Sequence, residues 1–155
     1  MAKKLALIAS KGSLDWAYPP FILASTAAAL DYDVQIFFTF YGLTLLKKDI
    51  SNLKVSPLGN PAMPMPVPMP NLAQMLPGME SMATMMMKQK IAKNGVASIE
   101  TLREACLESG VKLIACQMTV DLFDFKPDDF IEGIEFGGAA TFFEFAGASD
   151  VNLFI

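Results

Sequence analysis

The hydrophobic pattern of the first 48 residues alternates between short apolar runs and one longer apolar stretch. Residues 4–10 form an apolar run that precedes a glycine, and residues 34–39 are β-branched and aromatic, so both predict strands. The stretch between them, residues 15–30, predicts a helix with Asp15 as its N-cap. A short helix over residues 42–48, with basic residues in its last turn, is expected to follow the second strand.

The same alternation resumes at Ser98 and continues to the end of the chain. Ser98 opens a predicted helix that runs to Ser109, and Gly110 is typical of a helix stop. The remaining predicted elements are strands at 111–115, 133–136 and 151–155, a short helix beginning at 126–129, and a helix at 138–146. Strands that alternate with helices indicate a parallel sheet covered on both faces.

Residues 49–95 interrupt this alternation after the second strand. Seven prolines between residues 51 and 78 exclude any regular element other than extended or polyproline structure. Residues 80–92 then predict a helix rich in methionine and lysine. The segment is too apolar for a solvated linker, so we interpret residues 1–155 as a single α/β domain with a Met/Pro-rich insertion.

The insertion also concentrates methionine, with nine in residues 63–87. Met75, Met79, Met82 and Met86 recur at helical spacing and predict an apolar stripe. A hydrophobic lid or subunit interface, a docking surface for a partner, and Cu(I) binding by thioethers are the three interpretations that this composition allows. A peripheral membrane contact through this segment also stays open, although no stretch has the length and continuity of a membrane span.

Composition excludes several kinds of chemistry. The chain contains no histidine, which removes Ser-His-Asp and Cys-His hydrolases, His-ligated zinc and every histidine general base. Its net charge is −4 and Arg103 is its only arginine, so neither a nucleic-acid surface nor an arginine phosphate clamp is expected. Apolar residues make up 53% of the chain, and such a surplus on a small domain favours subunit interfaces.

Two cysteines remain as candidate reactive groups. They are too few for a disulfide framework or a structural zinc site, and the apolar run at the start is too short for a signal peptide. The expected compartment is therefore the reducing cytoplasm, and no metal or cofactor is predicted.

The two cysteines occupy different positions in the predicted elements. Cys106 shares one helical face with Ile99, Leu102 and Leu107, which is typical of a small core residue. Cys116 directly follows the third predicted strand, and the carboxyl ends of parallel strands form the edge where ligands and reactive groups gather. Free backbone N–H groups of the helical turn expected after Cys116 would favour a thiolate.

Five segments that span nearly the whole chain form a specific combination. They are residues 10–19 (SKGSLDWAYP), 37–43 (FFTFYGL), 59–64 (GNPAMP), 111–118 (VKLIACQM) and 133–141 (GIEFGGAAT). The combination resembles the DsrE/DsrF-like family, and more narrowly its branch with a long Met/Pro-rich insertion. The resemblance implies a three-layer α/β/α sandwich, a five-stranded parallel sheet of order 4-3-2-1-5, and homo-oligomers, with a trimer or a multiple of it favoured.

The resemblance also implies a function and a site. It implies a sulfur carrier or sulfurtransferase in which the cysteine of the Ala-Cys-Gln-Met block, Cys116, holds sulfane sulfur as a persulfide or thiosulfonate. A rhodanese-type donor and a TusA-type carrier are the implied partners. A thiolate can accept and release sulfane sulfur without a histidine base, which agrees with the composition.

Strand order decides which groups surround this cysteine. The order 4-3-2-1-5 places Tyr41 on one side and Gly137 and Gly138 on the other, whereas a flavodoxin-like order would place Lys11 beside it. The predicted substrate-binding residues are Lys11, Gly12, Tyr41, Gln117, Gly137 and Gly138. A solvated loop lysine and a tight strand-to-helix turn are the structural alternatives for Lys11 and for the two glycines.

Two rival functions stay open from the sequence alone. One is an oligomeric interaction subunit without covalent chemistry, its thiol buried and inert. The other is a Cu(I)-binding protein that would use Met63, Met65 and Met69. For the insertion, we expect residues 57–87 to pack on a neighbouring subunit or over the Cys116 edge, where they would limit access of water and small thiols.

Overall fold

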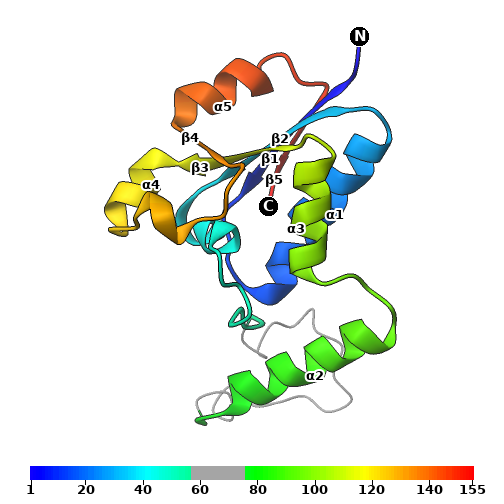
Figure 1. Cartoon of the computed structure of the whole chain (residues 1–155), viewed down its shortest axis with the longest axis vertical. Helices are drawn as coiled ribbons and strands as arrows, with labels where there is room; N and C mark the ends of the chain where they lie inside the picture. Colours follow the sequence, from blue (N-terminus) through cyan, green and yellow to red (C-terminus); the bar gives the residue numbers. More distant parts are fainter. Residues whose placement is uncertain (57–75) are drawn as a thin grey trace.

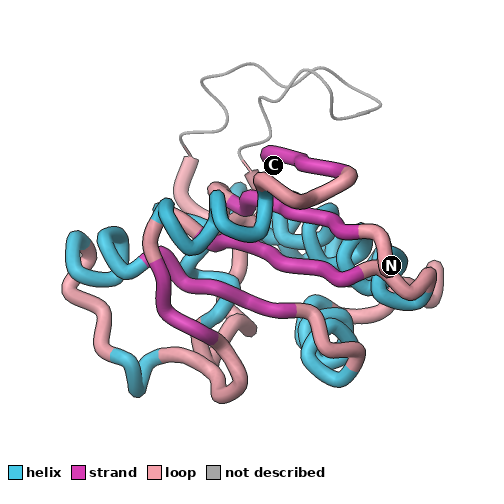
Figure 2. The backbone as a smooth tube through the Cα atoms, turned by 90° about the horizontal axis from the view of Figure 1, so that it is seen from above, coloured by secondary structure: helices cyan, strands magenta, loops and turns pink. Residues whose placement is uncertain are grey.

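A five-stranded, fully parallel sheet forms the centre of the computed structural model, which describes residues 1–56 and 76–155. The strands are β1 (Lys4–Ala9), β2 (Asp33–Phe38), β3 (Lys112–Cys116), β4 (Glu135–Gly137) and β5 (Val151–Phe154). Their order is β4-β3-β2-β1-β5, which confirms the order implied by the family resemblance. Figure 2 shows the strands side by side, with β5 at one edge and β4 at the other.

Helices cover the two faces of the sheet unequally. α1 (Leu14–Ala29) and α3 (Ile99–Glu108) pack together on one face, and α5 (Ala139–Ala146) lies on the other (Figure 1). The short α4 (Gln117–Leu122) continues from the carboxyl end of β3, and 3-10 turns are formed by η1 (Phe40–Leu46) and η3 (Pro127–Asp129). α2 (Met79–Lys93) stands apart from the sheet, at the end of the molecule below α1 and α3 in Figure 1.

Side chains that alternate along the strands build two cores. Leu7, Ile36 and Leu113 belong to the larger core under α1 and α3. Ile114 and Cys116 point to the opposite face, where a smaller core forms beneath α5. The Cys116 side chain therefore belongs to the α5 side of the sheet.

The N-terminus of α1 differs from the sequence prediction. Ser13, with extended φ and ψ, occupies the N-cap position, and Asp15 lies in the first turn. The Asp15 carboxylate accepts hydrogen bonds from the Ser56 backbone N–H at 2.8 Å and the Ser56 hydroxyl at 3.0 Å. Burial alone would raise the pKa of Asp15, but these hydrogen bonds, with one from Ser13, lower it below its ordinary value. Asp15 thus holds the start of the insertion rather than capping the helix.

Arg103 on α3, the only arginine of the sequence, is buried, which its charge did not predict. Its guanidinium donates to the carbonyl oxygens of Leu45 and Lys47, both at 2.8 Å. Both acceptors lie at the end of η1, which spans Phe40–Leu46 instead of the predicted 42–48. Arg103 therefore joins α3 to the segment that follows β2.

α2 confirms the predicted helix in the insertion, but its buried side differs from the expected methionine stripe. Ala83 and Thr84 are buried, whereas Met82 and Met86 are exposed. The Thr84 hydroxyl accepts from the Val55 N–H at 3.1 Å and donates to the Glu80 carbonyl at 2.8 Å. α2 packs on the α1 and α3 side of the sheet, so its residues do not cover Cys116. The rest of the expected lid, with Met75 and the candidate copper ligands, lies outside the described residues.

Candidate functional site

Cys116 is the last residue of β3 and the residue from which α4 begins. This agrees with the predicted position at the carboxyl edge of the sheet. β2 and β4 flank it, because Ala115 pairs with Phe38 on one side and Cys116 pairs with Gly137 on the other. The thiol is thus placed at the centre of the edge formed by three neighbouring strand ends.

The Cys116 side chain is buried, with 5% of its surface exposed. It belongs to the cluster formed by Phe37, Ile114, Phe142 and Ala146, in which the rings of Phe37 and Phe142 lie 5.6 Å apart. A thiol that is this deeply buried reacts only when a reagent passes between the surrounding side chains, or when the cluster opens transiently.

Gly137 and Gly138 lie at the turn from β4 into α5. A Cβ on Gly137 would meet the side chain of Thr141 at 2.9–3.1 Å, so glycine is required by close packing at this position. Gly138 has open space around its Cα and is the N-cap residue of α5. Because Gly137 pairs with Cys116, α5 begins at the same edge as the thiol.

A pair of threonines, which the sequence did not indicate, joins the start of η1 to α4. The hydroxyl groups of Thr39 and Thr119 lie 3.2 Å apart, and the Phe40 N–H donates to the Thr119 hydroxyl at 3.3 Å. Phe40 has a φ of +48°, which is unfavourable for a bulky side chain. Local strain of this kind costs about 1–3 kcal/mol and is concentrated at functional sites. No motif pattern in the sequence indicated this contact.

Tyr41 is exposed and stacks on Phe123, with ring centroids 5.9 Å apart. Phe123 also contacts Phe40 and Phe125 edge to face. This row of rings lies along the segment that follows β2 and the end of α4. Tyr41 is therefore placed at the carboxyl edge, as predicted, but its ring is held against another aromatic side chain.

Lys11 and Gly12 follow β1, which β2 separates from β3. The Lys11 ammonium lies 3.3 Å from the centroid of the Trp16 ring, so it is directed to the start of α1. A Cβ on Gly12 would lie 2.3 Å from the Tyr41 carbonyl oxygen, so glycine lets these two loops approach closely. The observed strand order thus does not bring Lys11 beside Cys116.

Gln117, the first residue of α4, is exposed. Its amide donates to the Asp121 carboxylate at 2.8 Å, one turn further along the helix. The predicted site residues therefore separate into a near group of Cys116, Gln117, Gly137 and Gly138, and a second group around Tyr41 and Gly12.

Cys106 lies on the opposite face of the sheet, within α3, and is fully buried. Its thiol donates to the Phe21 carbonyl at 3.5 Å. Burial raises the pKa of the Cys106 thiol from an ordinary 9.0 to about 11. The predicted role of Cys106 as a small core residue matches this environment.

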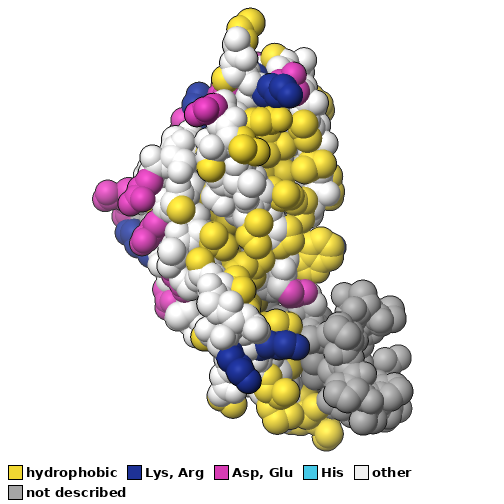
Figure 3. Space-filling view, turned by 90° about the vertical axis from the view of Figure 1, so that its right-hand side faces the viewer, with side chains coloured by type: hydrophobic (Ala, Val, Ile, Leu, Met, Phe, Trp, Pro, Cys, Tyr) yellow, Lys and Arg dark blue, Asp and Glu magenta, His cyan; other side chains and the backbone are white. Residues whose placement is uncertain are grey.

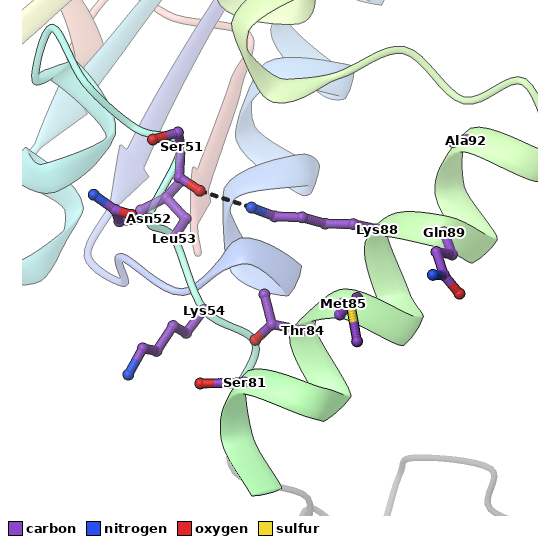
Figure 4. Close-up of a pocket in the computed structure, with 10 residues that line it drawn as sticks. All are labelled: Ser51, Asn52, Leu53, Lys54, Ser81, Thr84, Met85, Lys88, Gln89 and Ala92. Carbon is purple, nitrogen blue, oxygen red and sulfur yellow. Dashed lines mark hydrogen bonds between the residues drawn. The ribbon is translucent and has the colours of Figure 1, made fainter. Parts of the chain in front are cut away.

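A hollow of about 510 Å³ lies between α2 and residues 51–54 (Figure 4). The Lys88 ammonium crosses it and donates to the Ser51 carbonyl at 2.7 Å. Lys54 forms an ion pair with Glu80 at 3.2 Å. Both lysines near this hollow are thus engaged with protein groups.

In the part of the chain that the structure describes, no helix has the length and apolarity needed to cross a membrane. The same residues contain no cluster of three or more His, Cys, Asp or Glu side chains that could hold a metal ion.

The parallel sheet of order 4-3-2-1-5, with helices on both faces, is the fold of DsrE-like α/β proteins. Two solved structures share the fold at 11% sequence identity. The ychN protein of E. coli has a TM-score of 0.56 with 99% of both chains covered. Protein MTH1491 of Methanobacterium thermoautotrophicum has a TM-score of 0.53, with 99% of this chain and 97% of that chain covered.

Sequence comparison places the chain more narrowly. Residues 1–154 match the profile of the DsrE/DsrF/DrsH-like family, and the chain belongs to this family. It is 68% identical to the sulfur carrier protein DsrE2 of Allochromatium vinosum over 157 residues, which covers 99% of this chain and 98% of the relative. It is 31% identical to the uncharacterized protein YrkE of Bacillus subtilis, with 99% and 97% covered.

Proposed function

We propose that the protein is a sulfur carrier that holds sulfane sulfur on Cys116 and passes it to another thiol. The observation that carries the proposal is the position of this cysteine at the centre of the carboxyl edge, in a family member 68% identical to a named sulfur carrier. Cys106 is buried within a helix on the opposite face and takes no part.

The transfer requires only thiolate chemistry. The Cys116 thiolate attacks a sulfane sulfur of the donor, an S–S bond of the donor breaks, and its leaving group departs with the bond electrons. An acceptor thiolate then attacks the sulfane sulfur bonded to the Cys116 Sγ, in the persulfide or in the thiosulfonate, and Cys116 leaves as a thiolate. The proton of the original thiol goes to solvent, and no net oxidation occurs in either exchange.

The near group of residues supports this chemistry by position. Gly137 pairs with Cys116, and α5 begins two residues later, so the first N–H groups of α5 belong to the same edge. Gln117 is the exposed polar residue directly after the thiol. We assign Gln117, Gly137 and Gly138 to the sulfur-binding edge, and Tyr41, Gly12 and Lys11 to its outer rim.

Partners and assembly are part of the same proposal. A rhodanese-type protein is the proposed donor and a TusA-type protein the proposed acceptor, in a reducing cytoplasmic compartment. A homo-oligomer, a trimer or a multiple of it, is the proposed assembly. Repeated turnover with the donor and the acceptor would make the protein a sulfurtransferase, whereas a single transfer per loading would make it a carrier.

The experiment is intact-mass measurement of the native protein after incubation with tetrathionate or polysulfide. The expected result is one adduct that cyanide or a thiol removes, present in Cys106→Ser and missing in Cys116→Ser. Because Cys116 is 5% exposed, a second candidate is an oligomeric interaction subunit with an inert thiol. An adduct that forms only after unfolding would favour that second candidate.

A further inference from the structure

A sulfane sulfur on Cys116 brings negative charge into apolar surroundings. The deprotonated persulfide and the thiosulfonate both carry this charge on their outer atoms, and the side chains packed around Cys116 include Phe37 and Phe142. A charge among apolar groups is costly unless it accepts hydrogen bonds. The Gln117 amide, which follows the thiol, is held by the Asp121 carboxylate one turn along α4. A further hydrogen-bond donor is therefore needed at this edge of the sheet.

The basic side chains that follow β1 and β2 are directed elsewhere. The Lys11 ammonium lies 3.3 Å from the centroid of the Trp16 ring, and the Lys47 ammonium lies 3.8 Å from the centroid of the Phe125 ring. On the α1 and α3 side of the molecule, Figure 3 shows a broad band of hydrophobic side chains, with basic side chains beyond its ends. That side is the face of the sheet opposite to Cys116. A neutral donor on the face of the thiol is the alternative.

Thr39 lies in register beside Cys116. The ladder between β2 and β3 ends with Phe38 beside Ala115, and both of these side chains face the larger core. Thr39, with a φ of −134° and a ψ of 157°, continues the extended backbone, and its N–H donates to the Ala9 carbonyl at 3.1 Å. The next position on each strand therefore brings Thr39 opposite Cys116, at the spacing of about 4.8 Å between neighbouring strands. Because side chains alternate along a strand, both residues point to the α5 side of the sheet.

Thr119 fixes the direction of the Thr39 hydroxyl. Thr119 is fully buried, and its hydroxyl oxygen accepts the Phe40 N–H at 3.3 Å. Among the described residues, the Thr39 hydroxyl, at 3.2 Å, is the one other hydrogen-bond partner of this side chain. The buried Thr119 hydroxyl therefore uses its hydrogen by donating to Thr39. The hydrogen of the half-buried Thr39 hydroxyl then stays available for another acceptor.

We propose that the Thr39 hydroxyl donates a hydrogen bond to the negatively charged outer group of the sulfur adduct on Cys116, with Thr119 as the positioning residue behind it. The assignment rests on the proposed function, in which Cys116 carries the sulfur. The S–S bond of the adduct lengthens the Cys116 side chain by about 2.05 Å, which spans part of the interval between the two strands. A hydrogen bond to a charged acceptor is stronger than one to a neutral acceptor. Thr39 thus favours anionic over neutral groups on Cys116.

The test is the exchange equilibrium of the native full chain with tetrathionate and thiosulfate. The Cys116 thiolate attacks a central sulfur of tetrathionate, thiosulfate leaves with the bond electrons, and a negatively charged thiosulfonate remains on Cys116. Intact mass at several ratios of tetrathionate to thiosulfate gives the exchange constant. Thr39→Val should lower this constant about tenfold, the effect of losing one hydrogen bond to a charged group. Thr39→Ser keeps the hydroxyl and should keep the wild-type constant.

Exchange with diethyl disulfide and ethanethiol is the matched control, because the ethylthio group that it places on Cys116 is neutral. Thr39→Val should leave this second constant unchanged, whereas a general disturbance of the edge would change both constants. Thr119→Val should lower the tetrathionate constant alone, by a smaller factor, and an unchanged value would overturn the role of Thr119. Circular dichroism confirms that each variant is folded.

Two kinds of failure are distinguishable in this experiment. If the wild-type protein loads but Thr39→Val has the same tetrathionate constant, or loses both constants equally, the role of Thr39 is overturned while Cys116 still carries sulfur. If the native wild-type protein forms no adduct with either reagent, the proposed function is overturned, and the role of Thr39 with it.

Discussion

The two cysteines show how one residue type is given two roles by the fold. Cys106 lies within a helix between packed elements, donates to a carbonyl of α1, and has a pKa raised to about 11 by burial. Cys116 lies at a strand end, between the ends of two other strands and at the start of a helix. Both side chains are buried, so exposure alone does not separate them. They differ in the element that carries them, since Cys106 lies within α3 and Cys116 ends β3.

The largest expected effect is on sulfur loading. Cys116→Ser should abolish loading by tetrathionate, whereas Cys106→Ser should load as the wild-type protein does. Intact mass of the native proteins, before and after cyanide, is the measurement. Loading of Cys116→Ser with loss of loading in Cys106→Ser would reverse the comparison and place the chemistry on α3.

The second prediction concerns stability, on which Cys106→Ser should have a larger effect than Cys116→Ser. Cys106→Ser should lower the free energy of unfolding by about 1–3 kcal/mol, because a serine hydroxyl in the core is imperfectly satisfied. Cys116→Ser should cost less than about 1 kcal/mol, because the cluster around Cys116 is much smaller than the core that holds Cys106. Urea unfolding followed by circular dichroism measures both values. Equal losses in the two variants would show that the smaller core is as tightly packed as the larger one.

Much of the fold was predictable because local signals agreed with one another. Ser98 accepts from the Thr101 N–H at the start of α3, and Gly110 adopts a positive φ after its end, as the cap and stop signals indicated. The alternation of strands and helices predicted the parallel sheet. The strand order came from the family resemblance, since alternation alone allowed a flavodoxin-like order as well.

The features that escaped prediction depend on contacts between distant segments. Asp15 is a good N-cap residue, but its carboxylate bonds Ser56 instead. Arg103 shares the apolar face of α3 because two carbonyl groups from η1 lie within reach. Phe40, with its φ of +48°, donates its backbone N–H to Thr119, which lies 79 residues away in the chain. Burial of Cys116 depends on where α5 packs, which the pattern of α5 alone does not specify.

The third prediction tests what covers the thiol. Phe142 belongs to the same cluster as Cys116 and lies at the groove beside α5. Phe142→Ala should speed both loading of Cys116 and loss of the bound sulfur to glutathione, by several-fold, because access then needs less opening of the cluster. Samples that are quenched at successive times and measured by intact mass give the rates of loading and of sulfur loss. Phe143→Ala is the matched control, because Phe143 is exposed beside it, and unchanged rates in Phe142→Ala would show that access follows another route.

The smallest effect expected is on the pH dependence of stability. Because the folded-state pKa of Cys106 is raised above its unfolded value of 9.0, the folded state keeps its proton over a range in which the unfolded state has lost it. The stabilisation by the protonated thiol is therefore complete below about pH 9 and is lost as the pH rises toward 11. Urea unfolding at pH 8 and pH 10 should show a larger loss of stability over this pH range for the wild-type protein than for Cys106→Ala. If Cys106→Ala and the wild-type protein lose stability equally, the Cys106 thiol is more accessible to water than its position in α3 indicates.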